Sequence, residues 1–142
     1  TTEWELTLDS FPYGDTFLFL PRSPIQTVDS IAYVDSTGAT QTWNDANYIL
    51  SVAREPARVS IAYSQLWPTV RTQPDAVTIA YTAGYGDAAS VPMPIKQAIL
   101  LLVGHWFEHR SAVESVLKDV PLGVESLLNA YRVGDEFTCY AT

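Results

Sequence analysis

Short segments in which apolar and polar residues alternate fill the first 82 residues of the chain. Residues 4–9, WELTLD, alternate strictly, and the same period of two recurs in residues 76–82. Such alternation is typical of a β-strand with one buried face. Further apolar segments that predict strands are residues 17–20, 28–35, 39–43, 48–53 and 58–63.

Turn-forming residues separate these segments. Ser36, Thr37 and Gly38 predict a hairpin in which glycine supplies the positive φ. Pro21 and Pro24 predict that the strand over residues 17–20 ends there and is followed by an extended corner of the chain. We therefore expect an antiparallel meander, sandwich or small barrel of about six or seven short strands.

The hydrophobic period changes from two to 3.6 after Gly86. Pro92 and Pro94 introduce a helix predicted over residues 95–113, and a second helix is predicted from Pro121. The sequence thus predicts an α+β fold in a single domain over residues 1–142. Its parts are a β-rich region (1–90), a helical hairpin (91–132) and a C-terminal tail (133–142).

The first predicted helix is apolar around nearly its whole middle. A helical wheel places one stripe along it, and further apolar residues extend the surface beyond that stripe. The stripe contains Ile95, Ala98, Ile99, Leu102, Trp106, His109 and Val113, and the extension contains Leu100, Leu101, Val103 and Phe107. A helix that is apolar on all sides must be covered on all sides. We expect either residues preceding Thr1 or a neighbouring subunit to supply the cover, and we therefore expect an oligomer.

Composition narrows the possible partners. The 142 residues include 47% hydrophobic residues, enough for a packed core, and carry a formal charge of -8, which disfavours binding to nucleic-acid phosphates. Cys139 is the single cysteine, so no intrachain disulfide is possible. The apolar run 98–107 is far shorter than the roughly 20 residues of a membrane span, and no signal peptide is visible.

One motif raises the possibility of metal chemistry. Residues 105–109, HWFEH, match the H-x-x-E-H pattern of inverted zinc peptidases, with His105 and His109 as ligands and Glu108 as the base. A catalytic zinc needs a third protein ligand, and the residues after His109 offer acidic side chains but no recognisable companion motif. The better interpretation is a structural helix, with no catalytic residue, metal or cofactor.

Two further candidates concern partner contacts. Trp67 lies beside Pro68 in the long segment 64–74, where its side chain either anchors the loop to its own domain or contacts another subunit. Phe137 and Tyr140 are apolar residues in the acidic tail. They either form a partner contact or belong to a frayed terminus.

Several segments together cover most of the chain and point to a known family. They are WELTLDSFP, LPRSPIQTVDSIAYVDSTGATQTW, YSQLWPTVRTQPDAVTIAYTAGYG, VPMPIKQAILLLVGHWFEHRSAV and PLGVESLLNAYRV. In this order they resemble the head-tail connector (adaptor) proteins of long-tailed bacteriophages, prophages and gene transfer agents. Members of that family typically carry two helices before the β region, whereas this sequence starts at the β region.

The resemblance implies a non-enzymatic virion protein that is assembled in the bacterial host cytoplasm. It implies a ring, commonly of twelve copies, between the portal protein and the stopper or tail components, with DNA passing through its channel without sequence recognition. It makes residues 133–142 the candidate portal contact, and Leu101, His105, Glu108 and His109 candidates for an assembly helix. A β-rich tail or baseplate binding module remains an alternative, and a zinc hydrolase using H-x-x-E-H is a remote one.

Overall fold

The computed structural model of the protein describes residues 1–14, 17–108 and 122–132. Seven β-strands come first in this part of the chain, and two α-helices follow. The predicted α+β class, with an antiparallel β-rich region ahead of two helices, is confirmed. Contacts divide the described chain into two compact units, Thr1–Gly86 and Asp87–Arg132.

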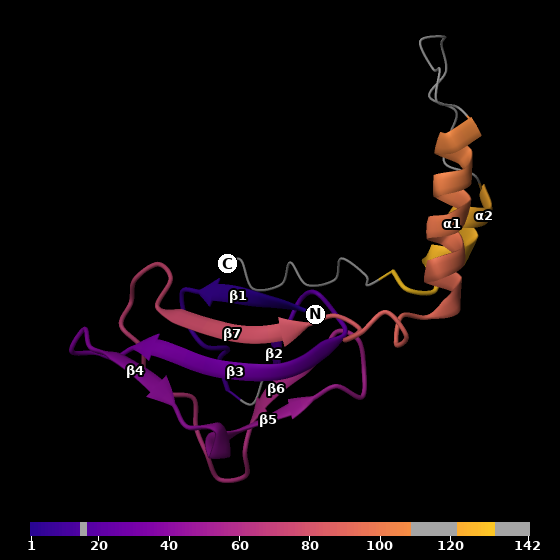
Figure 1. The fold of residues 1–142 in the computed structure, drawn as a ribbon. Coiled ribbons are helices and arrows are strands. Elements are labelled where there is room, and N and C mark those ends of the chain that lie inside the picture. Colours follow the sequence, from indigo (N-terminus) through magenta and orange to yellow (C-terminus); the bar gives the residue numbers. More distant parts are fainter. Residues whose placement is uncertain (15–16, 109–121, 133–142) are drawn as a thin grey trace. The chain divides into compact units, whose positions relative to one another are not determined.

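A four-stranded antiparallel sheet forms one layer of the first unit (Figure 1). Its strand order is β1 (Thr2–Leu8), β7 (Val77–Ala83), β3 (Ile25–Val34) and β4 (Thr40–Trp43). Ile31 lies opposite Ile79 on one side and opposite Trp43 on the other. The inward-facing residues of neighbouring strands therefore form rows across the sheet.

A smaller sheet lies across from the first one (Figure 1). It contains β2 (Leu18–Phe19), β6 (Arg58–Ile61) and β5 (Tyr48–Ser51), all antiparallel. A short 3-10 helix, Asp45–Asn47, leads into β5, and the Ala46 N–H donates to the Asn44 side chain at 2.9 Å. The sequence pattern gave no sign of this 3-10 helix, because three residues are too few to show a period.

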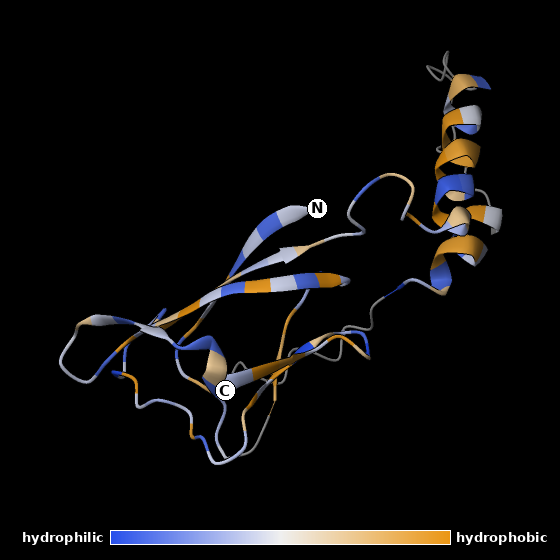
Figure 2. Ribbon diagram, turned by 60° about the horizontal axis from the view of Figure 1, so that its bottom comes forward, coloured by the Kyte–Doolittle hydropathy of each residue, from blue (hydrophilic) through white to orange (hydrophobic). Residues whose placement is uncertain are grey.

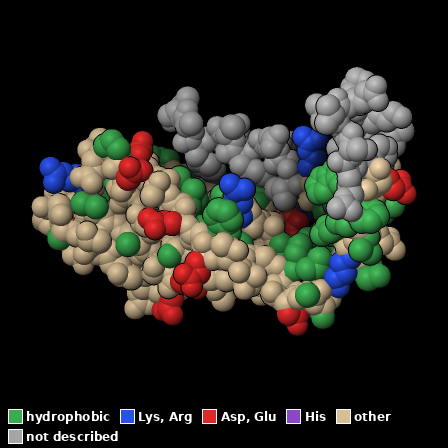
Figure 3. Space-filling view, turned by 45° about the horizontal axis from the view of Figure 1, so that its top comes forward, with side chains coloured by type: hydrophobic (Ala, Val, Ile, Leu, Met, Phe, Trp, Pro, Cys, Tyr) green, Lys and Arg blue, Asp and Glu red, His purple; other side chains and the backbone are tan. Residues whose placement is uncertain are grey.

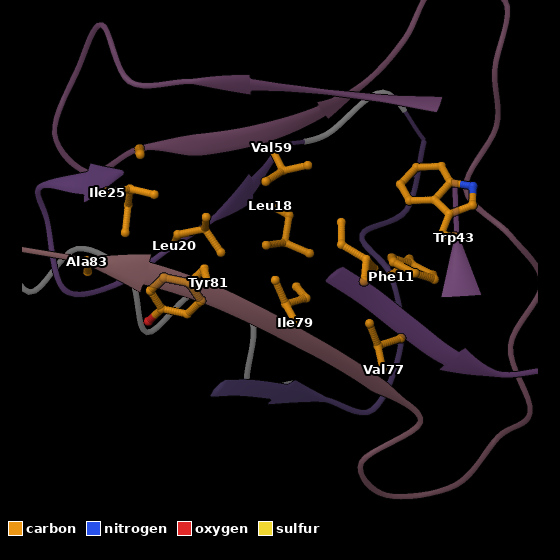
Figure 4. Close-up of a cluster of buried hydrophobic side chains, with 12 residues drawn as sticks. Phe11, Leu18, Leu20, Ile25, Trp43, Val59, Val77, Ile79, Tyr81 and Ala83 are labelled. Atoms are coloured by element: carbon orange, nitrogen blue, oxygen red, sulfur yellow. The ribbon is translucent and has the colours of Figure 1, made fainter. Parts of the chain in front are cut away.

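The strand β7 carries the central row of the core. Its residues alternate between buried and half-buried, with Val77, Ile79, Tyr81 and Ala83 pointing inward. They meet Leu18, Leu20 and Val59 from the region of the smaller sheet (Figure 4). Burial raises the pKa of the Tyr81 hydroxyl, which donates a hydrogen bond to the Pro21 carbonyl oxygen at 3.1 Å. The predicted one-sided strand 76–82 is thus present as a core strand.

The predicted hairpin between β3 and β4 is organised by one carboxylate. Asp35 accepts hydrogen bonds from the Thr37 hydroxyl and N–H, from the Ala39 N–H and from the Gln41 amide. Gly38 adopts φ +90°, as the turn pattern predicted. These bonds, led by those from the Thr37 and Gln41 side chains, hold the pKa of Asp35 at about 2.

The second unit is a pair of helices, α1 (Met93–Glu108) and α2 (Leu122–Asn129). Ala98 and Val124 are buried where the two helices contact each other. Half-buried Ile95, Leu102 and His105 lie on the same side of α1 as Ala98. The helix predicted from residue 95 begins two residues earlier, and its predicted end at residues 109–113 lies outside the described residues.

Replacement of Ile79 by alanine tests the core. The side chain is completely buried, so Ile79→Ala should lower the free energy of unfolding by about 2–5 kcal/mol. Ile49→Ala is the matched control, because Ile49 is 55% exposed and its loss should cost less than about 0.5 kcal/mol. Urea unfolding followed by tryptophan fluorescence measures both, and equal losses would contradict the assigned core.

The hairpin predicts a pH effect. The folded pKa of Asp35 is about 2 and its ordinary value is 3.8, so its contribution to stability is present above pH 4 and is lost as pH falls towards 2. Thr37→Val removes the hydroxyl donor and should raise the pKa of Asp35 towards 3.8. An NMR titration of the Asp35 carboxyl carbon measures its pKa in the wild type and in the variant. An unchanged pKa in Thr37→Val would show that the hydroxyl has no such role.

The helix pair predicts different effects of two valine substitutions. Val124→Ala removes two buried methyl groups and should destabilise the pair by on the order of 1–2 kcal/mol. Hydrogen exchange of the α1 amides should then be about tenfold faster. Val103→Ala makes the same chemical change at a 53% exposed position of α1 and should leave exchange nearly unchanged. If the two variants exchange alike, α2 does not pack as described.

Candidate assembly surface

The first helix begins at a turn held by a carboxylate. Asp87 accepts hydrogen bonds from the Ser90 hydroxyl at 2.7 Å and from its N–H at 2.9 Å, which lower the pKa of Asp87. The Pro92 carbonyl oxygen accepts from the N–H groups of Ile95 and Lys96. Pro94 is tolerated because the N–H groups of a first helical turn have no partner within the helix.

Only one side of α1 contacts α2. The apolar stripe of the helical wheel included Ile99 and Trp106, and these side chains are 53% and 65% exposed, so α2 covers only part of that stripe. The covered side follows Ile95, Ala98 and Leu102. A helix that is apolar almost all round has no preferred face in its own sequence, and the position of α2 decides which side is covered.

Seven large apolar side chains of α1 remain exposed, each by 49–69%. This outer face consists of Met93, Ile99, Leu100, Leu101, Val103, Trp106 and Phe107. Figure 2 shows hydrophobic residues along most of the helix, and Figure 3 shows hydrophobic side chains gathered over the helical unit. Contiguous exposed apolar surface of this kind marks an interaction site. Within the described chain, no helix has both the length and the apolar character needed to cross a membrane.

The residues of the H-x-x-E-H motif lie at the end of this helix. His105 is half-buried, and Glu108 is the exposed last residue of α1. His109 lies outside the described residues. Among the residues that are described, no three His, Cys, Asp or Glu side chains gather closely enough to hold a metal ion. The described part of the chain therefore provides no set of metal ligands around His105.

Trp67 lies in an aromatic cluster of its own unit. Its ring stacks on Phe11 with centroids 5.1 Å apart and lies 5.1 Å from the ring of Trp43. The packing is that of a side chain that anchors its loop, while a contact between Trp67 and another subunit stays a prediction. Phe137 and Tyr140 lie outside the described residues.

A second exposed surface lies just before Trp67 and was missed in the sequence. Tyr63 is 98% exposed and Leu66 is 82% exposed, and we call residues 63–66 the tip. The sequence pattern assigned Tyr63 to a strand over residues 58–63, but β6 ends at Ile61. An apolar residue just beyond a strand end looks the same in sequence as one inside it, so hydropathy gave no signal for the tip.

The comparisons with known proteins identify one group of structures. No protein-family model and no curated protein matches the sequence. A chain in the neck of a native gene transfer agent (GTA) particle computed with C12 symmetry matches at 27% identity and a TM-score of 0.70. A chain of the native GTA virion matches at 28% identity with a TM-score of 0.68, and one in the neck of an empty particle computed with C6 symmetry at 26% with 0.69.

The three matches cover nearly all of this chain. Each extends over 93% of its residues, while the chain spans 65–69% of the matched proteins' length. The β unit and the helix pair are therefore both included in the similarity. The structural match is to the neck region of gene transfer agent particles, a component of a phage-like virion.

Proposed function

We propose that this chain is a head-tail connector, a structural protein that forms a ring between the portal and the stopper or tail of a phage-like particle. The observation that carries the proposal is the outer face of α1, which exposes seven large apolar side chains on a fold shared with GTA neck proteins. A protein that exposes contiguous apolar surface of this kind needs partners, and a neck assembly supplies them.

The size of the outer face fits a contact between proteins. A fully exposed aromatic side chain offers about 150–250 Å². Trp106 and Phe107, exposed by 65% and 67%, therefore offer on the order of 200–330 Å² together. The five aliphatic side chains add to this area, towards the roughly 800 Å² that each partner contributes to a standard interface. Leu101, His105, Glu108 and His109 belong to this proposed assembly helix, with His105 and Glu108 as polar groups near its end.

The matched necks suggest the form of the assembly. They were computed with C12 and C6 symmetry, and both are compatible with a ring of twelve copies. The net charge of -8 suits a ring around DNA, because a wall rich in Lys and Arg would hold the phosphates by many contacts. We propose that DNA passes through the channel without sequence recognition.

The proposed partners of the ring are other virion proteins. We propose that residues 133–142, with Phe137 and Tyr140, contact the portal, and that a stopper or tail-completion protein binds the opposite side. Trp67 is a weaker candidate for a contact with another protein, since its ring already packs on Phe11 and Trp43. The proposed role is non-enzymatic, takes place in the virion and requires no cofactor.

Electron microscopy and native mass spectrometry of the purified full-length protein, with and without portal, test the proposal. Rings are expected, and Leu100→Asp should weaken their assembly because it places a charge on the outer face. Thr72→Asp is the matched control, since it adds the same charge to an exposed polar position of the β unit, outside the outer face of α1, and should leave rings intact. A protein that stays monomeric even with portal present would contradict the proposal.

A further inference from the structure

A closed ring of identical copies requires two different contact surfaces on each copy. In cyclic assemblies above dimers the contacts are head-to-tail, so one surface meets a different surface of the next copy. The outer face of α1 supplies one surface. We propose that the tip, residues 63–66, is the other, and that it docks on the outer face of α1 in the neighbouring copy. This inference rests on the proposed ring.

Backbone hydrogen bonds hold the turn of the tip, although its side chains lie in solvent. The Gln65 N–H donates to the Ala62 carbonyl oxygen at 3.1 Å, and Ser64 adopts φ +63°, a left-handed conformation that costs free energy in a residue other than glycine. The Ala62 N–H donates to the Asn47 carbonyl oxygen at 2.9 Å, which ties the start of the turn to the 3-10 helix. Strain that is maintained by surrounding contacts is a feature of functional sites.

The exposed chemistry of the tip suits a protein contact. Tyr63 and Leu66 are 98% and 82% exposed, which is unusual for large side chains with so much apolar surface. Tyrosine is enriched among the residues that dominate binding at interfaces. Because the backbone of the turn is already fixed, little further ordering is needed when the tip binds.

The distribution of charged residues favours a second copy of this chain as the partner that binds the outer face of α1. Copies with a net charge of -8 repel one another, so their contact surfaces must lie where charge is low. Residues 59–70, which include the tip, contain no Asp, Glu, Lys or Arg, and neither do residues 97–107 of α1. Apart from Lys96, whose ammonium group donates to the Ala89 carbonyl oxygen at 3.2 Å, the outer face and the tip carry no charged side chain. They lie on different units of the chain, which suits a head-to-tail contact between like-charged copies.

A mixing experiment tests the pairing. The tip variant Tyr63→Ser/Leu66→Ser and the face variant Leu100→Asp each lose one side of the contact, so each alone should require about tenfold or more protein to form rings. Mixed together, each pair retains one intact contact, and native mass spectrometry should show 1:1 heterodimers. Tyr13→Ser is the matched control, because Tyr13 is also 98% exposed, and it should form rings like the wild type.

The outcomes separate the inference from the proposed function. Wild-type protein that forms no rings, alone or with portal, contradicts the proposed function itself. Wild-type rings together with normal rings from the tip variant overturn the inference alone, as does the absence of heterodimers in the mixture. Loss of rings in Tyr13→Ser would also overturn it, because the effect would then not be specific to the tip. Near-UV circular dichroism of the tryptophan cluster verifies that each variant is folded.

Discussion

The β unit depends on the packing of β7 between β1 and β3. Its four inward side chains, Val77, Ile79, Tyr81 and Ala83, are all buried, and they connect the larger sheet to the apolar residues beside the smaller one. The same strand fixes the register of both neighbours through its ladder of backbone pairs. A slip by one residue would turn the whole apolar row outward, so this alternation specifies the arrangement of the larger sheet.

The helical unit has the opposite property. The eight residues of α2 are too few to cover the sixteen residues of α1, and the described structure leaves most of the α1 circumference exposed. In the β unit the apolar side chains are buried within the unit itself. In the helical unit the apolar surface of α1 stays exposed, so the hydrophobic effect favours its burial by association with another protein. We therefore assign the proposed assembly contact to the helical unit, because the β unit buries its own apolar residues whereas α1 leaves apolar side chains exposed.

Much of the fold was predictable from the sequence because its signals are local. Strict alternation predicted β1 and β7, and Gly38 predicted the hairpin. The prolines before Ile95 predicted the start of α1 to within two residues. The orientation of α1 was not predictable, since Ile99 and Trp106 are as apolar as the residues that α2 covers. Long-range packing also decided the position of Trp67, which the sequence left open between its own domain and a partner.

Of the two candidate surfaces, the outer face of α1 could be predicted from local sequence signals and the tip could not. An apolar circumference is visible in sequence, so the need for a further partner of α1 could be predicted, whereas the exposure of Tyr63 and Leu66 depends on where β6 ends and how the turn is held.

Assembly through α1 requires that its outer face becomes buried in the ring. Hydroxyl-radical footprinting of the monomer and of the ring, read by mass spectrometry, measures this directly. We expect the oxidation of Leu100, Trp106 and Phe107 to fall several-fold in the ring and that of Tyr13 to stay unchanged. Equal oxidation of the outer face in monomer and ring would contradict it.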